Sequence, residues 1–137
     1  MTIKEAYVSF ETAKLLKEKK FNEPLLTFYV TDGKEYSFDI MAFTDDKLKN
    51  ESECFILAPT LQMVCSWLRL VHHIHIESLC PVVDTDVKDG VGVTYNVVIS
   101  NLRNQCLAFD TNIEDIEYNS YEEAIEAGIL YTLKNLI

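Results

Sequence analysis

The stretch APTLQMVCSWLRLVHHIHIE, which runs from Ala58 to Glu77, decides the predicted fold. A helix is predicted from about Thr60 to Val71, because one set of apolar residues recurs at helical spacing: Leu61, Val64, Cys65, Leu68 and Val71. A second apolar stripe lies beside this face and holds Met63, Trp67 and Leu70. A helix that is apolar on almost every side is normally buried by more than one neighbour.

Upstream of this helix, the sequence predicts another helix and a hairpin. Ser9 suits the N-cap of a helix from Phe10 to about Lys20. Two runs rich in β-branched and aromatic residues then flank Asp32-Gly33, which is a strong hairpin signal: Leu25–Thr31 and Lys34–Phe38. The polar segment that follows, Asp39–Cys54, is expected to be mostly loop. It leaves room for short strands at Ile40–Phe43 and Cys54–Leu57.

Downstream of the central helix, His73–Leu79 alternates in polarity and predicts a half-buried strand. A predicted loop and two predicted strands follow it: Val82–Asp89, Val91–Ile99 and Gln105–Phe109. Ser120 and Glu123 form a capping box that begins a last helix, predicted to reach about Leu136. Gly128 lies on the apolar face of this helix, where a missing side chain predicts close packing against another element.

These elements predict an α+β fold in one domain of residues 1–137. Its three helices pack on antiparallel strands in the order α-β-β-(loop)-α-β-β-α. The chain has 137 residues, 48% of them apolar and 25% charged, which is typical of a globular domain. No apolar run approaches the roughly 18 residues that span a bilayer, and Met1–Phe10 lacks the apolar region of a signal peptide. We therefore expect a cytoplasmic protein without membrane contact.

The charge of the chain is strongly negative, with 22 acidic residues against 12 Lys and Arg and a formal net charge of −10. Direct binding to nucleic acid is not expected, because the phosphate backbone repels such a charge. The acidic residues gather between Arg103 and Lys134, where no Lys or Arg occurs. One set of them could dock on a basic protein or simply form a solvated surface: Glu114, Asp115, Glu117, Glu122, Glu123 and Glu126. We refer to this set as the acidic patch.

Three histidines raise the question of a metal site. His73 and His75 would share one face of the predicted strand, and Glu77 could be a third ligand. No other His exists outside His72, His73 and His75, so no metal site is predicted. Asp84, Asp86 and Asp89 lack the spacing of a calcium-binding loop and are interpreted as part of a polar turn.

The cysteines and the short motifs suggest no reaction. Cys54, Cys65, Cys80 and Cys106 form no C-x-x-C pair, and they are expected to be free thiols in a reducing compartment. The sequence contains no P-loop, no G-x-G-x-x-G nucleotide-binding motif and no G-x-S-x-G hydrolase motif. No catalytic residue, cofactor or cofactor-binding residue is therefore predicted.

Three stretches of the sequence resemble one known family. They are SFETAKLLKEKKF (Ser9–Phe21), APTLQMVCSWLRLVHHIHIE (Ala58–Glu77) and YNSYEEAIEAGILYTLKNLI (Tyr118–Ile137), about 53 of the 137 residues. They are similar to small uncharacterised proteins from phages and mobile elements of gut bacteria. Members of that family commonly have glycine before the phenylalanine that closes the first stretch, whereas this chain has Lys20. The resemblance implies an intracellular accessory protein and carries no activity with it.

Three functions remain open at this point. The first is a non-enzymatic interaction module, which could form a homodimer through Met63, Trp67 and Leu70 if nothing in the monomer covers them. The second is an acidic inhibitor that mimics nucleic acid and binds a basic host protein through the acidic patch. The third is a small metal-dependent enzyme that uses His73 and His75. Burial of Trp67 by the other helices would instead make it a core residue.

Overall fold

The structure of the chain is a computed structural model. It describes residues 4–23, 25, 27–40, 55–78, 82–84, 92–111 and 116–137. Contacts divide the chain into a first compact unit, Met1–Leu61, and a second, Gln62–Ile137. The predicted single domain stays a prediction.

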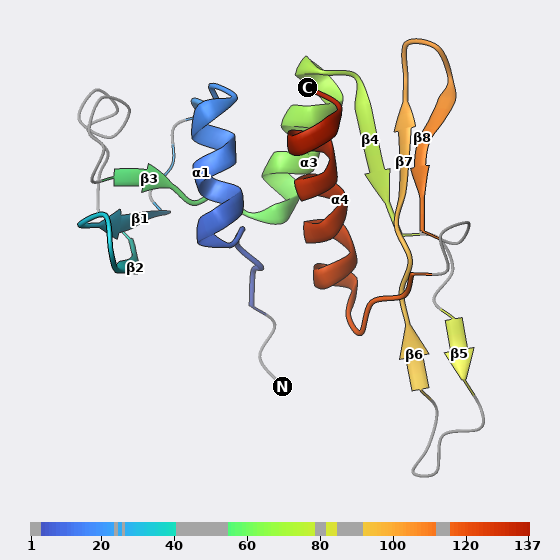
Figure 1. Cartoon of the computed structure of the whole chain (residues 1–137), viewed down its shortest axis with the longest axis horizontal. Coiled ribbons are helices and arrows are strands. Elements are labelled where there is room, and N and C mark those ends of the chain that lie inside the picture. Colours follow the sequence, from blue (N-terminus) through green and yellow to red (C-terminus); the bar gives the residue numbers. More distant parts are fainter. Residues whose placement is uncertain are drawn as a thin grey trace. The chain divides into compact units, whose positions relative to one another are not determined.

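Figure 1 shows the helices and strands of both units. The first unit holds α1 (Phe10–Glu18), β1 (Thr27–Thr31), β2 (Tyr36–Ile40) and β3 (Phe55–Leu57). At the border between the units, α3 spans Leu61–Val71. The remaining elements are β4 (Ile74–Glu77), β5 (Val82–Asp84), β6 (Gly92–Thr94), β7 (Val98–Asn101), β8 (Cys106–Asp110) and α4 (Tyr121–Asn135).

The predicted fold class is confirmed, because helices and antiparallel sheets share the described part of the chain. The described part of the chain has more strands than the predicted order of elements. One reason is that β3 joins the first sheet, and another is that β6 and β7 take the place of the single strand predicted at Val91–Ile99. None of the described helices is long and apolar enough to cross a membrane.

In the first unit, an antiparallel sheet of order β2-β1-β3 lies beside α1 (Figure 1). Ser9 caps α1 as predicted, since its hydroxyl accepts the Thr12 N–H at 3.3 Å. The central strand β1 is anchored by the Tyr29 hydroxyl, which donates to the Val8 carbonyl at 2.6 Å. Val8, Ala13 and Leu16 are fully buried, so the inner face of α1 forms the core of this unit.

The hairpin between β1 and β2 is present, but its turn is longer than the Asp32-Gly33 pair predicts. Residues 32–35 connect the strands, and β2 begins at Tyr36. The carboxylate of Asp32 closes the loop by accepting the N–H groups of Lys34 and Glu35, each at 2.9 Å. These hydrogen bonds hold the pKa of Asp32 below its usual value. Gly33 supplies the positive φ of 95° that the turn requires.

The C-terminus of α1 forms a Schellman motif, in which the residue after the cap adopts a left-handed conformation. The Phe21 N–H donates to the Leu16 carbonyl at 2.9 Å, and the Lys20 N–H donates to the Lys17 carbonyl at 3.1 Å. Lys20 occupies the left-handed position with φ of 64°. The left-handed conformation costs a residue with a Cβ about 1–2 kcal/mol of conformational free energy, which is why glycine is usual at this position. The helix therefore ends at Glu18, before the predicted end at Lys20.

The second unit has an antiparallel sheet of order β4-β7-β8, and α4 packs on β4 and β7 (Figure 1). Ile76 pairs with Ile99 across the two strands, and both are buried. From α4, Ile129 and Leu133 complete this part of the core. One half of the predicted capping box is confirmed, since the Ser120 hydroxyl accepts the Glu123 N–H at 3.1 Å. The other half differs, because the Glu123 carboxylate accepts the N–H of Asn119, at 3.1 Å, and not the expected N–H of Ser120.

Gly128 confirms the prediction of close packing. A Cβ at this position would lie 2.8 Å from Cγ2 of Ile76 and 2.8 Å from Cγ2 of Val97. Both neighbours are buried and β-branched, so these methyl groups cannot rotate freely away. The missing side chain therefore sets how closely α4 approaches the sheet.

Two predictions for the region between β4 and β8 are wrong. Val82–Asp84 was expected in a loop but forms β5, which pairs with β6; the rest of that predicted loop, residues 85–89, lies outside the described residues. The single predicted strand Val91–Ile99 is divided into β6 and β7. The division occurs because Tyr95 pairs with Tyr118, through N–H···O distances of 2.7 and 2.8 Å, while Val97 bonds Thr111. These partners are remote in sequence, so the local pattern could not reveal them.

Candidate functional site

The outer strand of the first sheet has an exposed apolar face. Tyr36, Phe38 and Ile40 alternate along β2 and therefore point to one side of the sheet. Their side chains are 57%, 41% and 61% exposed. We call these three residues the β2 row. Among the described strands, β2 pairs with β1 alone, so the row follows an edge of the sheet.

Aromatic contacts fix two side chains of the β2 row. The Tyr36 ring stacks on Phe10 of α1, with centroids 4.1 Å apart and planes 9° apart. The Phe38 ring lies 4.9 Å from Tyr7 and 5.6 Å from Tyr29. Aromatic pairs of this kind contribute about 0.5–1.5 kcal/mol beyond their buried area. The rings of Tyr36 and Phe38 therefore need little further ordering before the row binds a partner.

The backbone of the β2 row also points outward. Residues of an antiparallel pair alternate between hydrogen-bonded and non-hydrogen-bonded positions. The Asp32 N–H donates to the Glu35 carbonyl at 3.3 Å, which makes Glu35, and by alternation Ser37 and Asp39, the residues that bond toward β1. The N–H and C=O groups of Tyr36 and Phe38 therefore face the open edge, whereas the Ile40 N–H already donates to the Asp39 carboxylate at 2.8 Å. Side chains and backbone groups of the same three residues are presented together.

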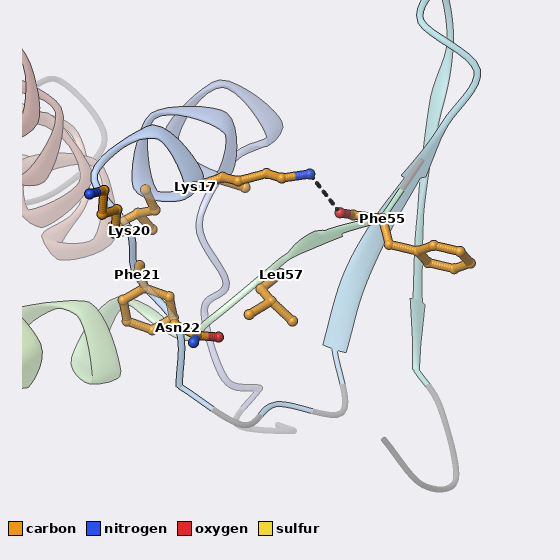
Figure 2. A pocket seen from close by; sticks show the side chains of 8 residues that line it. Lys17, Lys20, Phe21, Asn22, Phe55 and Leu57 are labelled. Carbon is orange, nitrogen blue, oxygen red and sulfur yellow. Dashed lines mark hydrogen bonds between the residues drawn. The ribbon is translucent and has the colours of Figure 1, made fainter. Parts of the chain in front are cut away.

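A second feature of the first unit is a pocket of about 260 Å³ between the end of α1 and β3 (Figure 2). Its lining includes three apolar residues, Leu16, Phe21 and Leu57, and three polar residues, Lys17, Lys20 and Asn22. Figure 2 shows Lys17 extending toward β3, where its ammonium donates to the Phe55 carbonyl at 3.3 Å. Lys20 lies at the other side of the pocket. Among the described residues that line it, the two charged ones are both basic.

The structure separates the three residues of the predicted helix stripe. Trp67 is only 8% exposed, and its ring meets His72 edge-on with centroids 4.6 Å apart. Met63 is 37% exposed and Leu70 is 76% exposed. Trp67 therefore adds little surface to an exposed stripe, and an interface through these residues stays a prediction.

The acidic patch is partly described. Glu114 and Asp115 lie outside the described residues. Glu122 and Glu123 are exposed in the first turn of α4, where acidic side chains favour the helix dipole. Glu123 also accepts the Asn119 N–H at 3.1 Å, so it has a structural role. Glu117 is exposed and Glu126 is half-buried, and docking of this patch on a basic partner stays a prediction.

The predicted placement of His73 on a strand face is wrong, because β4 begins at Ile74 and His73 has a φ of 57°. Because its backbone is left-handed, His73 does not follow the alternation of the strand. The prediction that His73 and His75 share one face depended on that alternation. His75 and Glu77 do share a face, with Nε2 and Oε2 3.6 Å apart. In the described part of the chain, no three His, Cys, Asp or Glu side chains gather closely enough to hold a metal ion.

The two described cysteines are free and differ in environment. Burial raises the pKa of the Cys65 thiol to about 11, although Arg69 partly opposes this change. Cys106 is exposed. Cys54 and Cys80 lie outside the described residues.

The rates at which the two thiols are alkylated should differ, because Cys65 is buried and Cys106 is exposed. At pH 8, iodoacetamide should modify Cys106 more than about tenfold faster than Cys65, because the thiolate is the nucleophile and burial suppresses it. The raised pKa of Cys65 stabilises the fold while the thiol is neutral, and this contribution is lost as the pH rises toward 11. Peptide-resolved mass spectrometry would measure both rates, with the unfolded chain as the control. Equal rates in the folded chain would contradict the burial of Cys65.

Sequence reasoning missed both features of the first unit. The alternation of Tyr36, Phe38 and Ile40 is visible in the sequence, but nothing local shows that β2 is an outer strand. The pocket depends on the turn after α1 and on a strand about 35 residues later in the chain.

Comparison of the chain with protein-family models, with curated proteins and with solved structures finds no match. The geometry of the described residues therefore carries the functional argument. Within it, β2 and α3 each carry three exposed large apolar side chains, and those of the β2 row lie on one face of an outer strand.

Proposed function

We propose that the chain is a non-enzymatic protein-interaction module that associates with a second copy of itself through the open edge of β2. The observation that carries this proposal is the exposed β2 row on an outer strand. In keeping with the resemblance of the helical stretches, we place the module in a phage or mobile element and in the bacterial cytoplasm.

An outer strand of this kind is suited to strand addition. Natural proteins protect sheet edges with charged side chains, proline or bulges. Within β2 only Asp39 is charged, on the face opposite the β2 row, and the strand has neither proline nor bulge, since its register with β1 is regular from Thr27 to Thr31. Exposed apolar side chains gathered on one face favour binding to another protein. Addition of a strand would satisfy the outward backbone groups and cover the apolar side chains at once.

The residue pattern of β2 favours a second copy as the added strand. Two such edges can pair antiparallel about a two-fold axis. With the axis at Phe38, the other two residues of the β2 row lie opposite each other, and Ser37 lies opposite Asp39 of the second copy. With the axis at Ser37, Glu35 would lie opposite Asp39, and like charges directly opposed are destabilising. The Phe38 register also joins backbone groups that already face the edge.

The predicted stripe on α3, Met63, Trp67 and Leu70, gives weaker support for a homodimer interface than the β2 row does. The β2 row presents three exposed side chains side by side, whereas Trp67 is buried between two exposed residues. A pair of short strands forms a small interface, so we expect a dimer that dissociates on dilution.

Two substitutions that add the same charge separate this proposal from a general charge effect. Ile40→Lys removes an apolar residue of the row and should weaken dimerisation by about tenfold or more, because edge lysines oppose strand pairing. Ser37→Lys places the new charge opposite Asp39 of the second copy and should strengthen dimerisation. Sedimentation equilibrium of both variants and the wild type would measure the dimer constants.

The outcomes are distinct. If only the net charge of −10 limited association, both variants would strengthen it to a similar extent. A wild-type chain that stays monomeric at the concentrations used for NMR would refute self-association through β2. Circular dichroism of each variant would confirm that the fold is retained.

A further inference from the structure

We infer that Asp39 is an autoinhibitory latch on the open edge of β2, and that this latch must open before a second copy can add its strand. The inference rests on the proposed function, because it concerns the regulation of the same edge. Its basis is one hydrogen bond, in which the Ile40 N–H donates to the Asp39 carboxylate at 2.8 Å. We call this hydrogen bond the Asp39 latch.

The N–H group of Ile40 is one that strand addition needs. Ile40 pairs with Thr27 of β1 at a position where, by the alternation of the ladder, its N–H points away from β1. In the antiparallel dimer centred on Phe38, Ile40 lies opposite Tyr36 of the second copy. Opposed residues at such positions exchange both of their N–H···O bonds, so the Ile40 N–H would donate to the Tyr36 carbonyl of the second copy. Two-fold symmetry repeats this bond in the opposite direction.

The Asp39 carboxylate competes with that carbonyl for the same donor. A hydrogen bond to an ionised carboxylate is stronger than one to a neutral carbonyl. The negative charge also lies where the partly negative carbonyl oxygen of the second copy would arrive, so the two oxygen atoms repel each other. Charged side chains protect the sheet edges of many proteins in this way. The closed latch therefore weakens both ends of the strand pair and leaves its centre at Phe38 open.

The latch can open without any change in the sheet. Asp39 is exposed, and in the strand alternation its side chain projects on the face of β2 opposite the β2 row. Its backbone stays paired with Phe28 of β1 whichever way the carboxylate turns. Water solvates an exposed carboxylate well, so opening costs little more than the hydrogen bond to Ile40. The latch thus weakens self-association without preventing it.

The other edge of the same sheet is also covered by a charged side chain. The Ala58 N–H donates to the Thr27 carbonyl, so by alternation the Phe55 carbonyl points away from β1. The Lys17 ammonium donates to this carbonyl at 3.3 Å (Figure 2). On both outer strands of the sheet, a charged side chain thus occupies a backbone group that strand addition would use.

Asp39→Ala removes the latch and should strengthen dimerisation of the full chain about fivefold in sedimentation equilibrium. Glu35→Ala is the matched control, because Glu35 is exposed, carries the same charge and by alternation projects to the same side of the hairpin. It should change the dimer constant by less than about twofold. Equal strengthening by both variants would show a general effect of the net charge of −10 and would overturn the latch.

Hydrogen exchange of the Ile40 N–H tests the latch without the dimer. In protein dilute enough to be monomeric, this group should exchange about fivefold or more slowly in the wild type than in Asp39→Ala, each rate being taken relative to an unstructured peptide of the same sequence. Equal relative rates would overturn the latch whatever the dimer constants are. Dimers of equal strength in the two chains would overturn the latch and leave the proposed function standing. Monomers of both chains at the concentrations used for NMR would refute self-association, and the latch with it.

Discussion

Replacing Trp67 with alanine should lower the free energy of unfolding by about 3–5 kcal/mol, the cost of removing a large aromatic side chain from a core. Trp67 is 8% exposed in the middle of α3, and its ring packs edge-on against His72. Neighbouring side chains cannot fill the space that an indole leaves, so a cavity remains. Urea unfolding followed by circular dichroism would measure the change, since the variant loses the only tryptophan of the chain.

Leu70→Ala is the matched control on the same helix. Leu70 is 76% exposed, so its truncation should change the free energy of unfolding by no more than about 0.5 kcal/mol. If Trp67→Ala instead unfolded like the wild type but lost a dimer, Met63, Trp67 and Leu70 would form an interface. That outcome would replace the β2 row as the site of association.

Gly128→Ala should also destabilise the chain, by about 1–2 kcal/mol. Alanine favours a helix over glycine by about 1 kcal/mol, so propensity alone predicts the opposite sign. The new methyl would, however, lie 2.8 Å from methyl groups of both Ile76 and Val97, and overpacking of this kind costs about 1–3 kcal/mol. Thermal and urea unfolding would give the sign directly.

A second substitution tests the cause. Val97→Ala removes one of the two methyl groups that the new Cβ would meet. In combination with Gly128→Ala, it should cost less than the sum of the two single changes, because the added methyl fills part of the space left behind. Additive losses, or a stabilising Gly128→Ala, would show that α4 can move away from the sheet without cost.

The helices could be predicted from the sequence because their signals are local. Ser9 and Ser120 cap α1 and α4 as expected, and the apolar spacing from Leu61 to Val71 matches α3. Gly128 was correctly expected at a close contact, since a glycine on an apolar helix face has few other uses. These features depend on residues within a few positions of each other.

The strands after α3 depend on distant partners, and there the sequence was insufficient. Val82–Asp84 is a strand because it pairs with β6, and Tyr95 interrupts the next strand because it pairs with Tyr118. The left-handed backbone at His73 also changes which residues share a face of β4. No local pattern of polarity distinguishes these cases from a loop or a continuous strand.

The candidate site also depends on residues that are distant in the sequence. The alternation of Tyr36, Phe38 and Ile40 was present in the sequence, but exposure follows from the strand order β2-β1-β3. Stacking on Phe10, which is far from Tyr36 in sequence, orders the Tyr36 ring. The apolar character of the row could be predicted from its residue types, whereas its exposure to solvent depends on the arrangement of the strands in the sheet.

Concentration-dependent amide hydrogen exchange in β2 tests the proposed association most directly. The outward N–H groups of Tyr36 and Phe38 should exchange slowly in concentrated protein and become faster on dilution, because the second copy covers them only in the dimer. The N–H group of Ser37 faces β1 and should exchange at the same rate at both concentrations. If Tyr36 and Phe38 exchanged at rates independent of concentration, the edge of β2 would not be the interface.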